Sequence, residues 1–226
     1  MPTVLVTSAS RGIGREFVRQ YAGEGWRVIA ACRAPEVEAE ALRAMGEVRP
    51  IAMDVTDLAS VEAVARESVD PLHLLINSAG IIGQTEDDPG QVDYREWARV
   101  MDVNLMGPVR VLDAFADRLA ASGAAKAVAI TSGMGSLADV QSPMAVMYRT
   151  SKAGLNMAMR VRALQLAPRG VTVAVINPGW VRTDMGGPGG KVGVEESVAG
   201  MRAAIERLTA DGAGRFLNWQ GADLPW

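Results

Sequence analysis

The sequence predicts an α/β fold, in which a parallel sheet of about seven strands is flanked by helices in one doubly wound domain. Two observations carry this prediction. Short, continuous apolar runs such as 4–6 and 171–176 are typical of strands that are buried on both faces. These runs alternate with segments of helical periodicity, and the opening of the chain reads strand, turn, helix, strand. Units of this kind are almost always right-handed, and their strands are parallel.

The composition bounds the size of the core and excludes several classes of partner. The chain has 226 residues, so we expect residues 1–226 to form a single domain. A formal net charge of −3 offers no basic field for nucleic acid or an anionic membrane. The single cysteine, Cys32, and the single histidine, His73, cannot build a disulfide framework or a metal site of several such ligands. No apolar run reaches the ~18 residues of a membrane span and no leader precedes the first strand, so we expect a soluble, cytoplasmic protein.

The first half of the chain contains three predicted strand–helix pairs and a fourth strand. The first helix carries Ile13, Phe17 and Tyr21 on one stripe. The second covers 35–46 and is rich in alanine and glutamate. The strands of this half are expected at 4–6, at 26–31, within 50–57 and at 72–76.

The second half continues the alternation. Helices 108–119 and 148–166 are apolar around more than one stripe, so we expect them to be covered on two sides, by the sheet and by another subunit. The carboxylates of Asp87 and Asp88 lie in a loop beside Pro-Gly and are expected to be solvated. The other expected elements are a helix at 94–101 that leads into 103–105, strands at 128–132 and 171–176, and a last helix at 198–208.

The functional prediction depends most on Tyr148 and Lys152. Four residues apart on a helix, they would lie on one face, one turn apart. A free tyrosine has a pKa of about 10, and an exposed ammonium beside it is expected to stabilise the phenolate and lower that pKa. Such a tyrosine can donate a proton to a carbonyl or remove one from an alcohol. Alone, the pattern more often marks a solvated helix face, so its weight depends on the rest of the chain.

The turn at 7–14, after the first strand, is a candidate phosphate site. Gly12 and Gly14 let the backbone approach a ligand closely, and the start of the next helix favours a phosphate group. A turn that is merely tight is the alternative, and the turn alone does not decide between the two.

This turn, TSASRGIG from Thr7 to Gly14, resembles the TGxxxGIG cofactor motif of the short-chain dehydrogenases/reductases. Further motifs follow in the family's order: 77–80 is similar to the NNAG turn, 148–152 to YxxxK and 178–179 to the PG motif. The resemblance covers the whole chain and implies a Rossmann-like fold. Ser8 departs from the family's glycine, and its Cβ disfavours a positive φ.

The resemblance also implies a cofactor, NADP in preference to NAD. In the family, an acidic side chain at the end of the second strand binds the ribose 2′-hydroxyl and selects NAD. Cys32 stands at that position, and Arg33 and Arg11 lie where guanidiniums suit a 2′-phosphate. Two solvated surface arginines are the alternative. The residues that the resemblance assigns to the cofactor are Thr7, Ser10, Arg11, Gly12, Ile13, Gly14, Arg33, Asp54, Val55, Asn77, Ala79, Gly80, Tyr148, Lys152, Pro178, Gly179, Val181 and Thr183.

The catalytic set that the resemblance implies is Asn104, Ser132, Tyr148 and Lys152. Tyr148 would be the general acid/base, and Lys152 would lower its pKa and hold the nicotinamide ribose. Ser132 would hydrogen-bond the substrate oxygen, and Asn104 would support a water beside the lysine. Ser132 stands further from Tyr148 than in most members; Ser136 is closer but lies beyond the strand end and fits less well.

The longer loop after Ser132 and the ending around 216–226 resemble the C-factor/sniffer-like branch, which is associated with signalling as well as carbonyl reduction. We therefore expect an NADP(H)-dependent oxidoreductase that interconverts a small-molecule carbonyl and an alcohol. The alternative is an NAD(P)-binding signalling or regulatory protein with vestigial catalysis. The family also implies a homodimer or homotetramer, and no metal.

Overall fold

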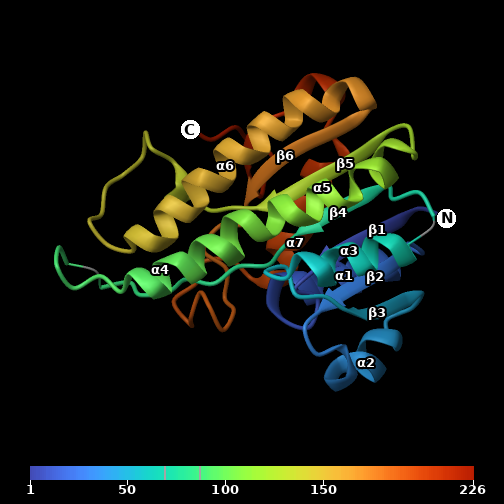
Figure 1. Cartoon of the computed structure of the whole chain (residues 1–226), viewed down its shortest axis with the longest axis horizontal. Coiled ribbons are helices and arrows are strands. Elements are labelled where there is room, and N and C mark those ends of the chain that lie inside the picture. Colours follow the sequence, from blue (N-terminus) through green and yellow to red (C-terminus); the bar gives the residue numbers. More distant parts are fainter. Residues whose placement is uncertain (69, 87) are drawn as a thin grey trace.

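The computed structural model describes residues 1–68, 70–86 and 88–226, and in this part of the chain seven strands form one sheet (Figure 1). All neighbouring strands are parallel, in the order β3-β2-β1-β4-β5-β6-β7. The predicted fold class, a doubly wound parallel sheet of about seven strands, is confirmed. The strands are β1 (Thr3–Thr7), β2 (Arg27–Cys32), β3 (Val48–Ala52), β4 (Leu74–Asn77), β5 (Ala125–Ile130), β6 (Val171–Asn177) and β7 (Phe216–Asn218).

Helices cover both faces of this sheet (Figure 1). Helices α3, α5 and α6 pack on one face, around a core that includes Phe115 and Leu155. Helices α1, α2 and α7 pack on the other, around Phe17 and Met201. Among the helices of the described ranges, none combines the length and apolar character that a membrane crossing requires. The helices are α1 (Gly12–Gly23), α2 (Pro35–Arg43), α3 (Leu58–Glu67), α4 (Tyr94–Met101), α5 (Gly107–Ala120), α6 (Val146–Leu166) and α7 (Val194–Glu206).

Strand β1 shows why the apolar runs are continuous. Val4 and Val6 join the core under α1 and α7, while Leu5 between them joins the core under α3, α5 and α6. Successive side chains of a strand point to opposite faces, so a strand covered on both sides needs apolar residues at every position. Each fully buried valine or leucine contributes roughly 1.5–3 kcal/mol to folding.

The turn between β1 and α1 brings the helix directly onto the end of the strand. A Cβ on Gly14 would lie 2.3 Å from the carbonyl oxygen of Ser8, so only glycine fits there. Ser8 itself has φ +55°, in the left-handed region that favours glycine. The chain thus accepts strain at Ser8 to keep the tight turn that the motif predicts.

Two segments differ from the sequence prediction. The last strand, β7, is only three residues long and pairs with β6, too short to be located from its apolar pattern. The two helices expected around 94–105 and 108–119 are one continuous helical segment, in which a π-helical turn at Asp102–Met106 joins α4 to α5. Of the loop at 87–90, Asp87 lies outside the described residues, and Asp88 is exposed as expected.

Candidate active site

The predicted site residues gather at the carboxyl edge of the sheet, where the strand order reverses. From β1 the sheet grows to β2 and β3 on one side and to β4–β7 on the other, and ligands bind in such crevices between the two halves. Here Thr7 Oγ1 accepts hydrogen bonds from the amides of Ser78 (3.0 Å) and Ala79 (3.2 Å). The end of β1 is therefore fixed to the turn that follows β4.

Tyr148 lies in the first turn of α6, and its hydroxyl is hydrogen-bonded to Ser132. Ser132 follows the end of β5 and caps the short 3₁₀ turn Gly133–Gly135, with its Oγ accepting from the amide of Met134 at 3.1 Å. Burial raises the pKa of Tyr148 to about 12, and the hydrogen bond with Ser132 opposes this rise. The phenol is therefore protonated at neutral pH, which is the form that can donate a proton.

Lys152, one turn further along α6, is only 3% exposed. Its Nζ donates to the carbonyl oxygen of Ile130 at 2.9 Å and lies 5.7 Å from the centre of the Tyr148 ring. Burial lowers the pKa of Lys152 to about 8. The ammonium is still largely charged at neutral pH, close to the tyrosine.

One expectation from the sequence is wrong. It predicts an exposed ammonium that lowers the pKa of Tyr148, whereas Lys152 is buried and the pKa of Tyr148 is raised. The cause is desolvation, which disfavours the charged form of each group: the phenolate of Tyr148 and the ammonium of Lys152. The sequence could predict that the two side chains lie on one face of the helix, but it could not predict how deeply they are buried.

Asn104 lies in the π-helical turn and is fully buried. Its Nδ2 donates to the carbonyl of Ile81 (2.8 Å) and to Ser151 Oγ (3.0 Å), and its Oδ1 accepts from the amide of Ile81 (2.8 Å). A Cβ on Gly80 would stand 3.5 Å from Lys152 Nζ and 3.6 Å from Asn104 Oδ1. The turn after β4 thus passes between the asparagine and the lysine.

The start of α1 has the features of an anion site. Arg11 is the N-cap residue, but its side chain makes no hydrogen bond to the first turn, which consists of Gly12, Ile13 and Gly14. A Cβ on Gly12 would meet only the methyl group of Thr183, at 3.8 Å. Backbone amides at a helix start that have no side-chain cap and few neighbouring side chains are suited to binding a phosphate. Ser10 is half-buried in the same turn.

The predicted adenosine residues lie at the ends of β2 and β3. Cys32 is buried and Arg33 is exposed. Asp54 Oδ1 accepts from the amide (2.9 Å) and the hydroxyl (2.7 Å) of Thr56. These bonds, and to a smaller extent the charge of Arg33, lower the pKa of Asp54. Arg33 and Asp54 are therefore close enough to interact, as a shared binding site requires.

Two further predicted residues are buried between elements. Val55 packs against Gly107 at the start of α5, where a Cβ would come within 2.9 Å of its methyl group. Asn77 Nδ2 donates to the carbonyl of Pro108 at 3.1 Å. Its Oδ1 is buried and has no hydrogen-bond partner among the described residues.

The segment 178–193, which we call the flap, follows β6 and reaches back to the turn after β1. It starts at Pro178 and Gly179, and its buried Val181 forms a bridge with Val192. Thr183 Oγ1 accepts from the amide of Gly186 at 3.1 Å. The neighbouring Asp184 lies 3.9 Å from Arg11, so an exposed ion pair links flap and turn.

The structure separates the two candidate serines. The hydroxyl of Ser136 donates to the main-chain oxygen of Trp226 (3.2 Å) and accepts from the amide of Asp139 (3.2 Å). Ser132, in contrast, is hydrogen-bonded to Tyr148.

The sequence prediction missed Ser151, which links Asn104 to the carbonyl of Tyr148. It also missed Asn156, although a polar residue four positions after Lys152 was visible in the sequence.

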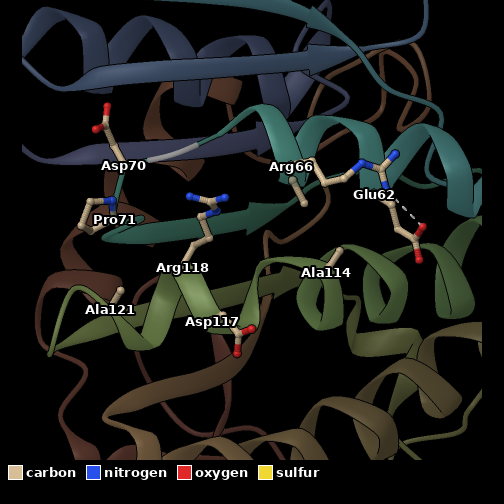
Figure 2. Close-up of a pocket in the computed structure, with 9 residues that line it drawn as sticks. Glu62, Arg66, Asp70, Pro71, Ala114, Asp117, Arg118 and Ala121 are labelled. Atoms are coloured by element: carbon tan, nitrogen blue, oxygen red, sulfur yellow. Dashed lines mark ion pairs between the residues drawn. The ribbon is translucent and has the colours of Figure 1, made fainter.

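One cavity of the described part of the chain lies away from the candidate site. A cavity of about 480 Å³ lies between α3 and α5 (Figure 2), where Arg66, Asp117 and Arg118 line it beside small side chains. It includes Asp70 and Pro71, which precede β4, and so opens at the amino-terminal edge of the sheet. Within the described residues no group of three or more acidic, histidine or cysteine side chains could hold a metal ion.

Comparison with known proteins finds relatives over most of the chain. The profile of the family described as short chain dehydrogenase matches residues 2–191. The C-signal of Myxococcus xanthus is 41% identical over 156 residues, which cover 69% of this chain and 93% of that protein. A 1-hydroxy-2-glutathionyl-2-methyl-3-butene dehydrogenase of Rhodococcus sp. AD45 is 34% identical over 233 residues, with both chains fully covered.

Solved structures show the same fold. The NADPH-bound carbonyl reductase from chicken fatty liver superposes with a TM-score of 0.90 at 33% identity, covering 100% of this chain and 99% of that one. A carbonyl reductase from Pseudomonas aeruginosa PAO1 in complex with NADP has a TM-score of 0.88 at 31% identity, with both chains fully covered.

We expect Lys152→Met to stabilise the protein at pH 7. The change removes the cost of burying an ammonium, which a pKa shift from 10.5 to about 8 puts at roughly 3 kcal/mol. It also leaves the carbonyl of Ile130 without its donor, at a cost of about 1 kcal/mol or more. The free energy of unfolding in urea should therefore rise by about 1–2 kcal/mol.

This gain should depend on pH in one direction. Below about pH 8 the lysine is charged in both the native and unfolded states, and its cost is complete. Between about pH 8 and 10.5 the native protein releases the proton while the unfolded chain keeps it, so wild-type stability rises and the advantage of methionine shrinks. Lys191→Met, at an exposed position, is the control. Equal differences at pH 7 and pH 9.5 would contradict a desolvated ammonium.

Proposed function

Because the chain belongs to the short-chain dehydrogenase family of oxidoreductases, we propose that it interconverts a carbonyl and an alcohol with NADP(H), with Tyr148 as the general acid/base. The observation that carries the proposal is the grouping of Tyr148, Ser132 and Lys152 at the same edge of the sheet as the uncapped start of α1. The substrate would be a small molecule, since these groups lie at the carboxyl edge of the sheet, where such folds bind small ligands.

The protein's own groups handle the proton and the developing charge. Bound NADPH supplies a hydride to the carbonyl carbon. The substrate oxygen takes the hydroxyl proton of Tyr148. This proton is present at neutral pH because the pKa of Tyr148 is raised. Ser132 donates a hydrogen bond to that oxygen, where negative charge develops in the transition state. Lys152, charged and buried 5.7 Å from the ring centre, stabilises the phenolate that remains. The reverse reaction uses the same groups in the opposite sense.

The residues present fit a dinucleotide with a 2′-phosphate. The uncapped amides of Gly12, Ile13 and Gly14 would hold the pyrophosphate. No acid stands at the end of β2, and Arg33 is exposed beside Asp54. The carbonyl reductases from chicken and Pseudomonas aeruginosa, which were crystallised with NADPH and NADP, support the same cofactor here.

Tyr148→Phe tests the proposed acid/base. The change keeps the ring and its packing but removes the transferable proton, so kcat for carbonyl reduction should fall by about 10²–10⁴-fold. NADPH affinity, measured by fluorescence titration, should stay nearly unchanged. A variant that keeps wild-type kcat would overturn the proposed role.

Arg33→Ala tests the choice of cofactor. A charge-assisted hydrogen bond to the 2′-phosphate contributes about 1.5–3 kcal/mol, so the Kd for NADPH should rise by roughly 10- to 100-fold. The Kd for NADH should hardly move, because NADH lacks that phosphate. Arg43→Ala, also exposed and two turns along α2, controls for the loss of positive charge. Equal losses for both cofactors would rule out a 2′-phosphate contact.

A second candidate function is a signalling or regulatory protein that binds NAD(P) with vestigial catalysis. The 41% identity to the C-signal of Myxococcus xanthus favours it. The two functions differ in turnover: consumption of NADPH with any member of a panel of aldehydes, ketones and quinones supports the reductase. Binding of NADPH without turnover over the whole panel would favour the second function.

We further propose that α6 pairs with its copy in a homodimer, from which a homotetramer can form. Met157, Val161 and Leu164 are 43–75% exposed and lie on one stripe of this helix, an apolar surface that a monomer would leave in water. Sedimentation at micromolar concentration should give a dimer or tetramer, and Leu164→Glu should shift it to monomer. Wild-type protein that sediments as a monomer would refute the pairing.

A further inference from the structure

Asn156 is an unusual residue for its position in α6. It is 3% exposed and lies among buried apolar side chains such as Leu155 and Met159. Asparagine is a weak helix former, and a buried amide costs free energy unless it is fully hydrogen-bonded. Neither the helix nor the apolar core requires an amide here, so its partners indicate its role.

Both ends of this amide are bonded to the segment that carries Ser132. Asn156 Oδ1 accepts from the hydroxyl of Thr131 at 2.6 Å, and Nδ2 donates to the carbonyl oxygen of Gly135 at 3.2 Å. A carbonyl can only accept, which fixes the orientation of the amide and makes the Thr131 hydroxyl the donor. Thr131 directly precedes Ser132, and Gly135 ends the turn that Ser132 caps. The Asn156 side chain is therefore hydrogen-bonded to residues before and after Ser132 in the chain.

The same segment is packed tightly on α6. A Cβ on Gly135 would lie 2.9 Å from the carbonyl carbon and 3.0 Å from the Cβ of Lys152. Lys152 Nζ in turn donates to Ile130, immediately before Thr131. Residues 130–135 are thus attached to one face of α6 at Lys152 and again at Asn156, one turn later. Ser132 lies inside this attached segment.

We infer that Asn156 is a positioning residue: it holds Ser132 at the distance from Tyr148 that the proposed reaction requires. The inference rests on the proposed function, since it acts through the serine that bonds the substrate oxygen. Lys152 fixes the end of β5 from one side, and Asn156 fixes the turn beyond it. Without the amide, the turn Gly133–Gly135 would keep its own backbone bonds, the cap from Ser132 and the close packing of Gly135 on Lys152, but it would lose both side-chain bonds to α6 beyond Lys152.

The test is a double-mutant cycle between Asn156→Leu and Ser132→Ala. Leucine fills a similar volume without the two bonds, and a displaced catalytic group lowers the rate, so kcat should fall by about 10- to 100-fold. The Kd for NADPH should change by less than about twofold, because Asn156 is not among the residues assigned to the cofactor. In a Ser132→Ala background, Asn156→Leu should have little further effect on kcat, because the group it positions is gone. The same loss of kcat with and without Ser132 would overturn the inference.

Two further measurements keep the result interpretable. If Asn156→Leu does not fold, Thr131→Val takes its place in the cycle, since it removes only the hydroxyl that bonds the amide. Gln165→Leu, which removes an exposed amide from the same helix, should leave kcat unchanged. Hydrogen exchange at Met134 and Gly135 should be at least about tenfold faster in Asn156→Leu, whether or not the enzyme turns over a carbonyl. A wild-type enzyme without activity would refute the proposed function. Unchanged hydrogen exchange at Met134 and Gly135 in Asn156→Leu would refute the inference that Asn156 holds this turn in place.

Discussion

The contact on which the candidate site depends most is the burial of Lys152 against the end of β5. Its ammonium is removed from water and donates to Ile130, which brings α6 so close to the strand that only glycine fits at position 135. The same approach places Tyr148 within reach of Ser132. Burying a charged group costs free energy even when it is hydrogen-bonded, and the protein accepts this cost beside the tyrosine that we propose as the general acid/base.

Desolvation also sets the resting charges of the site. It favours a neutral phenol at Tyr148, and it weakens but does not abolish the charge at Lys152. The two shifts bring the pKa of a base down and that of an acid up, so each group is in the form that reduction needs at neutral pH. In the oxidative direction the phenolate would be required, and the raised pKa works against it.

The sequence predicted most of the fold, and it named candidate site residues that the structure brings together at one edge of the sheet. Residues such as Val4–Val6 are apolar at every position because the sheet is covered on both sides, and that pattern is local. The burial of Lys152 was not predictable from the sequence. It depends on how α6 packs against the end of β5, a contact between residues more than 20 positions apart in the chain. The π-helical turn at Asn104 was missed because its extra residue shifts the apolar stripe, and in the sequence such a shift looks like a break between two helices. Ser151 and Asn156 were missed because the polar character of a helix residue does not say which way it faces.

The parallel topology also orders the events by which the site is assembled during synthesis. The hydroxyl of Thr7 accepts from the amide of Ser78, 71 residues later in the chain. The carbonyl of Ile130 gains its hydrogen bond from the ammonium only after Lys152 has been synthesised. Pairings of such separation form only after the intervening chain is available, and domains emerge from the ribosome amino-terminal end first. The turn at 7–14, which we propose binds the pyrophosphate, is therefore translated well before the helix that carries the tyrosine and lysine. A nascent chain that ends before α6 contains the turn at 7–14 but lacks Tyr148, Lys152 and the flap, so the candidate site can be completed only late in synthesis.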